Sequence, residues 1–161
     1  MKTVRIMLLA LIALLAMPQT RAEVLGAHDE AIHDAARLST GAQVAAILKA
    51  DPAMRDARTN SGATPLHLAA TNPDRSALKT LLAAGADANA RDNEGVTPLH
   101  MAAYTQKAAH AQLLLEAGAD PAIKSNAGRD ATSMASKAMA HEAAGVISLW
   151  ILKGCKAGQP C

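Results

Sequence analysis

Histidine, cysteine and serine are the residue types of this chain that could do chemistry, but their spacing does not favour it. A metal site on one helical face needs two histidines four residues apart, and none of the six histidines pairs with another in that way. The chain also has no His-Glu-x-x-His motif, no Gly-rich phosphate loop and no nucleophile elbow. Ser133 and Ser136 have no evident base partner in the sequence. We therefore expect no catalytic residue, no metal site and no cofactor.

The two cysteines, Cys155 and Cys161, both lie in the last seven residues. Their spacing matches neither Cys-x-x-Cys nor a haem-attachment motif. In an oxidising compartment such a pair favours a disulfide within one chain, which would close the C-terminal tail over the terminal helix near Trp150. A redox-active or metal-capturing pair, two free thiols, and a disulfide between chains are the alternatives.

Residues 1–22 have the three parts of a secretory signal peptide. Two basic residues among the first five form a charged start, an uncharged apolar run extends over 6–17, and Ala22 is suited to the position before cleavage. The apolar run is shorter than the roughly 20 residues that a spanning helix needs. An uncleaved anchor and a buried helix of the fold are the alternatives. We expect an exported chain that starts near Glu23, periplasmic or secreted, with no stable membrane insertion.

Composition and charge exclude several classes of protein. The chain has one Trp, one Tyr and no Phe, and 39 of its 161 residues are Ala. β-Sandwiches and barrels draw on β-branched and aromatic residues, so this composition argues against an all-β fold. Without residues 1–22 the chain has 13 Lys and Arg residues against 14 Asp and Glu, a net charge of −1. This balance gives no electrostatic reason to expect nucleic acid or acidic lipid as a partner.

Several short segments recur along the chain at one shared offset of 33. The recurring pairs are 64–67 with 97–100 (Thr-Pro-Leu-His), 81–82 with 114–115 (Leu-Leu), and 85–87 with 118–120 (Gly-Ala-Asp). Gly62, Gly95 and Gly128 fall on the same grid. A shared period of this length indicates a stacked array of small structural units.

Each unit carries the signals of two short helices and a turn. Thr64 is suited to the N-cap of a helix and Pro65 to its first turn, where the missing N–H costs nothing. A second helix with an apolar leucine face is expected near 76–84, and Gly85 stands where a helix ends in a left-handed residue. The segment 92–95 (Asp-Asn-Glu-Gly) has the composition of a projecting β-turn.

The Thr-Pro-Leu-His and Gly-Ala-Asp motifs resemble those of ankyrin repeats, and the resemblance covers residues 28–153. It implies an all-α ankyrin-repeat solenoid of about four repeats, two full and two capping, each a helix-turn-helix with a β-turn. The first repeat is degenerate and aligns with an offset of 34, and the last one has lost Thr-Pro-Leu-His. The implied domains are a signal peptide at 1–22, the ankyrin-repeat domain at 23–153 and a Cys-containing tail at 154–161.

The resemblance also assigns roles to residues. It gives His67 and His100 a structural role, in which each imidazole ties adjacent turns by hydrogen bonds to backbone. Partner contacts are implied at the turn tips and at the exposed ends of the first helices. By position these are Asn60, Ser61, Thr71, Asn72, Asn93, Glu94, Val96, Tyr104, Thr105, Asn126 and Arg129. Tyr104 is the expected anchor, because Tyr is enriched at binding hot spots, although packing against its neighbours is an alternative.

Arg58, Arg91 and Lys124 fall on the same grid as well. They could form a basic column that faces an acidic partner, or they could be a solvated row without such a role.

Together these patterns predict an exported, monomeric protein-binding module without catalysis. It would act as an adaptor, stabiliser or inhibitor of a protein partner in the periplasm. The alternatives are a redox or metal-handling periplasmic protein that uses Cys155 and Cys161, and a secreted effector.

Overall fold

The computed structural model describes residues 30–158, so the predicted signal peptide at 1–22 and Cys161 lie outside the described part. This part contains four consecutive pairs of helices and no strand. The pairs are α2 (Ala31–Leu38) with α3 (Gly41–Ala50), α4 (Pro65–Ala69) with α5 (Arg75–Ala83), α6 (Pro98–Tyr104) with α7 (Ala108–Glu116), and α8 (Ala131–Lys137) with α9 (His141–Leu152). A 3-10 helix, η2 (Pro52–Asp56), follows the first pair. The predicted all-α solenoid of four repeats is confirmed.

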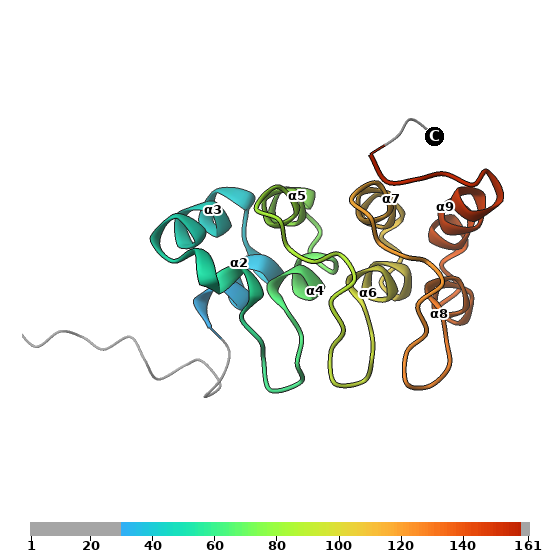
Figure 1. Cartoon of the computed structure of the whole chain (residues 1–161), viewed down its shortest axis with the longest axis horizontal. Helices are drawn as coiled ribbons and strands as arrows, with labels where there is room; N and C mark the ends of the chain where they lie inside the picture. The colour runs from blue at the N-terminus through green and yellow to red at the C-terminus, as the bar shows by residue number, and fades with distance from the viewer. Residues whose placement is uncertain (1–29, 159–161) are drawn as a thin grey trace, which may run out of the picture.

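The helices stack in two layers (Figure 1). The first helices of the four pairs, α2, α4, α6 and α8, form the inner layer, and the second helices, α3, α5, α7 and α9, form the outer layer. Neighbouring helices of one layer pack against each other, and so do the two helices of each pair. Long turns between the pairs project side by side from the inner layer, below the helices in Figure 1.

The inner helices are too short to be stable alone, and tertiary packing holds them. Helix α4 has five residues and α6 has seven, each with a Thr at the N-cap and Pro as the first helical residue, as the sequence predicted. Alanine dominates their buried face, since Ala69, Ala70, Ala102 and Ala103 have no exposed surface. Small side chains let successive inner helices approach closely and leave the larger volume to leucine.

Leucines fill the space between the two layers. In the second repeat Leu66, Leu78 and Leu81 have no exposed surface, and in the third repeat Leu114 is equally buried. The buried leucines confirm the predicted register of the second helices. Together with buried Ala, Ile and Val residues they form one continuous apolar core through all four repeats.

The predicted helix end and turn both form. Gly85 adopts a φ of +81°, and its N–H and that of Ala86 bond to the carbonyls of Leu82 and Leu81, at 3.0 Å each. This pattern ends a helix with a left-handed glycine. In the turn at 92–95, the Gly95 N–H bonds to the Asp92 carbonyl at 3.0 Å.

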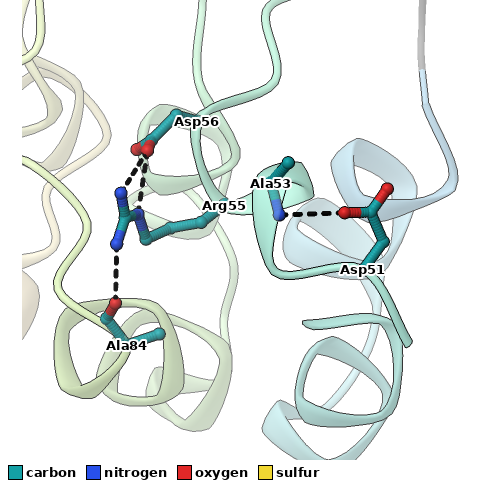
Figure 2. Close-up of polar contacts among 5 residues, drawn as sticks. All are labelled: Asp51, Ala53, Arg55, Asp56 and Ala84. Atoms are coloured by element: carbon teal, nitrogen blue, oxygen red, sulfur yellow. Dashed lines mark hydrogen bonds and ion pairs between the residues drawn. The ribbon is translucent and has the colours of Figure 1, made fainter. Parts of the chain in front are cut away.

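The first repeat ends differently, because η2 replaces the glycine turn (Figure 2). Asp51 begins η2 by accepting a hydrogen bond from the N–H of Ala53 at 2.9 Å. Arg55 donates from Nε to Asp56 at 2.9 Å and from Nη1 to the carbonyl of Ala84 at 3.2 Å. Arg55 therefore joins the end of the first repeat to the end of α5 in the second.

Candidate partner-binding surface

A row of buried histidines joins successive repeats. His67 Nδ1 accepts the backbone N–H of Thr64 at 3.1 Å, and Nε2 lies 3.0 Å from the carbonyl oxygen of Val96 in the next repeat. His100 makes the equivalent pair of contacts, 3.2 Å to the N–H of its own N-cap and 3.0 Å to the carbonyl of Arg129. Because Nδ1 accepts, the proton must reside on Nε2, which donates to the carbonyl. The predicted structural role of both histidines is confirmed.

The environment of this row favours the neutral imidazole. Burial is the largest cause that lowers the pKa of His67 and of His100, and the hydrogen bonds to Val96 and Arg129 oppose it only in part. A second proton on either ring would point Nδ1–H at the backbone N–H that it now faces. Both histidines are therefore fixed as structural groups and offer no lone pair to a metal or a substrate.

His33 is a third member of the row that the sequence pattern did not reveal. Its Nδ1 accepts the N–H of Glu30 at 3.0 Å, and its Nε2 lies 3.2 Å from the carbonyl oxygen of Ala57. The signal was its spacing to His67, which equals the offset of 34 that aligns the degenerate first repeat. The tetrapeptide at 30–33 (Glu-Ala-Ile-His) has no Thr, Pro or Leu, so it does not match the Thr-Pro-Leu-His motif.

The row ends in the last repeat, where Ser133 occupies the position of the histidine. Asp130 caps α8 there by accepting the N–H of Ser133 at 2.8 Å. The described part contains no fifth repeat, so a ring at this position would have no following turn to bond. The loss of the motif is explained by its place at the end of the stack.

The three turn tips are tied to one another. Asn93 donates from its backbone N–H to the carbonyl of Ser61 at 2.9 Å and from Nδ2 to that of Asn60 at 3.0 Å. Asn126 does the same one repeat later, at 2.9 Å to Glu94 and 3.1 Å to Asn93. The side chains of Asn93 and Asn126, predicted as partner contacts, thus also have a structural role at the tips.

The aligned arginines contribute to the same turns. Arg58 donates from Nη1 to the carbonyls of Gly62 and Arg91, both at 2.8 Å. Arg91 reaches the side-chain oxygen of Asn126 at 3.4 Å. These arginines connect neighbouring turns, a role that neither the basic-column nor the solvated-row interpretation included.

Two of the predicted contact residues are corrected by their burial. Only 2 % of Asn72 is exposed, and its Nδ2 donates to the carbonyls of Ala36 and Ser39 at 2.9 Å each, back to the first repeat. Val96 is 8 % exposed within the stack. The Asn72 side chain is held inward by these two bonds and by a third one, in which its Oδ1 accepts the N–H of Asp74 at 2.8 Å.

The other predicted residues have exposed or half-buried side chains. Tyr104 is 54 % exposed, and Asn60, Ser61 and Glu94 are exposed at the tips. Thr71 and Thr105 are half-buried, and each hydroxyl donates to a carbonyl of its own helix turn. Arg129 is half-buried as well. Contact of these residues with a partner stays a prediction.

A column of apolar side chains accompanies Tyr104 and was missed by the sequence analysis. Leu68, Met101 and Met134 occupy equivalent positions on α4, α6 and α8, and each is half-buried. Met101 is three residues before Tyr104, so the two side chains share one side of α6. Unbranched methionine adapts to varied partners, which makes this column suited to recognition. The repeat grid of the sequence could have revealed it.

Other predictions concern chemistry and the membrane. Among residues 30–158, no group of three or more His, Cys, Asp or Glu side chains could hold a metal ion. No helix in that range is long and apolar enough to span a membrane. Cys155 is described but Cys161 is not, so their pairing stays a prediction.

Comparison with known proteins gives one finding. A family model described as "Ankyrin repeats (3 copies)" matches residues 29–125, which is more than half of the chain. The match spans the first three helix pairs and the turn that leads to the fourth. The search of curated proteins gave no match.

Proposed function

The chain belongs to the ankyrin-repeat family, and from this premise we propose that it binds a protein partner through its turn tips and the exposed side of its inner helices. Ankyrin repeats generally mediate protein–protein interaction. The proposed mechanism is presentation of a rigid surface, with no chemical step. The proposal rests on the hydrogen bonds that hold the turn tips in place.

The hydrogen bonds between tips are the observation that supports the proposal most directly. Asn93 and Asn126 each bond twice to the preceding turn, and Arg58 bonds across to the next. Backbone that is already ordered loses little conformational entropy when a partner binds. The exposed side chains between these bonds, Ser61 and Glu94 among them, are therefore presented at fixed spacing.

The chemistry of the surface favours a partner with an apolar side chain flanked by polar groups. Tyr104 offers a ring that is 54 % exposed, next to the half-buried Met101 on the same side of α6. Burial of such a ring with its hydroxyl kept in a polar contact is typical of a binding hot spot. Glu94 provides an exposed carboxylate on the preceding tip, suited to a basic group of the partner.

The first test is affinity capture from cell-envelope extract with the full sequence, expressed with a C-terminal tag. We compare the parent with Tyr104→Ala and Glu94→Lys. Lys79→Ala is the matched control, because Lys79 is an exposed residue with a long side chain on α5, in the outer layer. A partner retained by the parent and the control, but lost by Tyr104→Ala, supports the proposal.

Titration of the purified partner then gives the magnitude. As a hot spot, Tyr104 is expected to contribute about 2 kcal/mol or more, which corresponds to a roughly thirtyfold weaker affinity for Tyr104→Ala. Equal affinity of parent and both variants would contradict the proposed surface. Loss of binding in the control alone would assign the partner to the outer layer.

We further propose that the chain is exported and acts in the periplasm as an adaptor, stabiliser or inhibitor. The apolar segment at 6–17 with a small residue at 22 supports export. Cell fractionation tests this location. An intact mass equal to that of a chain beginning at Glu23 tests cleavage of the leader. If the captured partner is an enzyme or toxin, its activity with and without this chain separates an inhibitor from a stabiliser.

A further inference from the structure

Large apolar side chains are exposed mainly in the last repeat. Six such side chains are exposed among the described residues, and four of them, Met139, Leu149, Ile151 and Leu152, lie in this repeat. Leu149 is 51 % exposed and Leu152 is 83 % exposed. Exposed apolar side chains that lie close together often mark a contact surface, so we infer that this part of the last repeat is covered.

The exposed residues of α9 form one stripe. Glu142, Gly145, Leu149 and Leu152 follow one another at intervals of three and four residues, and all four are exposed. They lie on the solvent-facing side of α9, since the equivalent residues of α7, which are Ala109, Gln112 and Glu116, are exposed as well. Among the four outer helices of the described part, only α9 carries large apolar side chains on this side.

The stripe is complementary to itself when two copies are placed antiparallel. Leu149 and Gly145 are one helical turn apart, so a two-fold axis between them sets each Leu149 against the Gly145 of the other copy. A Cβ placed on Gly145 would meet no atom within 4 Å, which leaves an open site that a leucine can enter. A two-fold contact needs this kind of self-complementarity.

The charges at the two ends of α9 match the same arrangement. Glu142 and Lys153 are separated by about three whole helical turns, so they lie on one side of α9 at opposite ends. In an antiparallel pair, Glu142 of each copy faces Lys153 of the other. A parallel pair would place like charges together, which disfavours it.

We propose that the chain forms a two-fold dimer in which the α9 helices of two copies pack antiparallel, with Leu149 of each copy against Gly145 of the other. The turn tips lie on the far side of the stack from α9, and the dimer does not cover them. The dimer is therefore independent of the proposed partner surface. The monomer expected from the sequence is the alternative that the experiment tests.

The first experiment measures molar mass by sedimentation over a series of concentrations, with the full sequence expressed and its N-terminus established by mass spectrometry. We expect twice the monomer mass at high concentration, with and without reductant, because the contact is not a disulfide. Leu149→Glu should remain a monomer at every concentration. Leu38→Glu, at the opposite end and 76 % exposed, should dimerise like the parent.

Charge exchange tests the antiparallel orientation. Glu142→Lys and Lys153→Glu should each weaken dimerisation several-fold, because every dimer contains the pair twice. The double variant should restore it. A double variant that is as weak as either single one would overturn the antiparallel arrangement.

Gly145→Leu separates an interface role from a structural one. In the monomer the new side chain meets open space and replaces a helical glycine, so the melting temperature of the monomer should rise. In the dimer it fills the site of the opposing Leu149, so dimerisation should be lost. A parent that stays monomeric at every concentration, or a Leu149→Glu variant that dimerises normally, would overturn the proposal.

Discussion

The first and the last repeat each place an outer helix at an end of the described stack, yet their exposed faces differ in chemistry. Helix α3 exposes small alanines together with Gln43 and Lys49. Helix α9 exposes Leu149 and Leu152. The face of α3 is suited to water, whereas that of α9 exposes large apolar side chains to it.

The polar ties of the two ends differ as well. The first repeat keeps His33 and is bonded to the second, for example by the 2.8 Å hydrogen bond that the N–H of Gly41 donates to the Ser76 hydroxyl. The last repeat receives a bond from Gln106 to the Ala138 carbonyl at 3.2 Å, but Ser133 sends none onward. A single replacement, Ser133 in place of histidine, thus ends the row of histidines. Making the exposed apolar face of α9 polar would instead need several replacements.

The largest effect is expected from a substitution in the core that connects the two ends. Leu114→Ala should cost about 2–5 kcal/mol of unfolding free energy, because Leu114 is fully buried in α7 between them. Urea denaturation measures the loss. Leu38→Ala, on an exposed side chain of α2, is the matched control and should change the free energy by less than about 0.5 kcal/mol. Similar losses in both variants would contradict the assigned register.

The next effect is a dependence on pH that comes from buried histidines, His67 and His100 of the row and His110 of α7. Burial lowers the pKa of each below the usual 6.5, so their stabilisation is complete above that pH and is lost as the pH falls below it. Unfolding free energy should therefore be lower at pH 5 than at pH 7. Asp74 and Asp130 also have lowered pKa values, but from 3.8, so they act only in stronger acid.

His67→Ala sharpens this assignment. The variant should lose about 1–3 kcal/mol at pH 7, because it leaves the Val96 carbonyl and the Thr64 N–H unpaired. Its stability should also change less between pH 7 and pH 5 than that of the parent. A variant with the parent's full pH dependence would assign the acid sensitivity to other groups.

A smaller effect compares two equivalent loops, each between the helices of one repeat. Asn72→Ala should cost about 1–2 kcal/mol, because two carbonyls of the first repeat lose their donor. Thr105→Ala, at the equivalent position of the next repeat, removes only a bond within its own repeat and should cost a few tenths of a kcal/mol. Thermal unfolding of the pair measures the difference. Equal costs would mean that the tie to the first repeat contributes nothing.

The smallest expected effect is that of Arg55→Ala. Arg55 bonds to the end of α5 from an exposed position, so solvent screens the contact and the shift in melting temperature should be smaller than for Asn72→Ala. Asn89→Ala is its counterpart, since Asn89 donates to the Gly118 carbonyl at 2.9 Å at the next joint. A larger loss for Arg55→Ala than for Asn72→Ala would place the main tie of the first repeat at η2.

The helices, the turns and the histidine bonds of the two full repeats could be predicted, because each has a local signal in the chain. Thr and Pro start the inner helices, Gly85 ends α5, and the repeat grid relates His67 to His100. The prediction was less complete where signals are changed or depend on another repeat. The role of His33 was hidden by a degenerate motif, and the burial of Asn72 depends on carbonyls of the preceding repeat.

The sequence by itself determined the fold, since local caps, apolar faces and a fixed period all favour the same stack and leave no helix able to bury its face alone. It also determined that the motif histidines are structural. Only the tertiary structure decided which of the residues predicted to be exposed are in fact exposed. That property depends on the packing of one repeat on the next, which buries Asn72 and Val96 and leaves Tyr104 and the α9 stripe in contact with water.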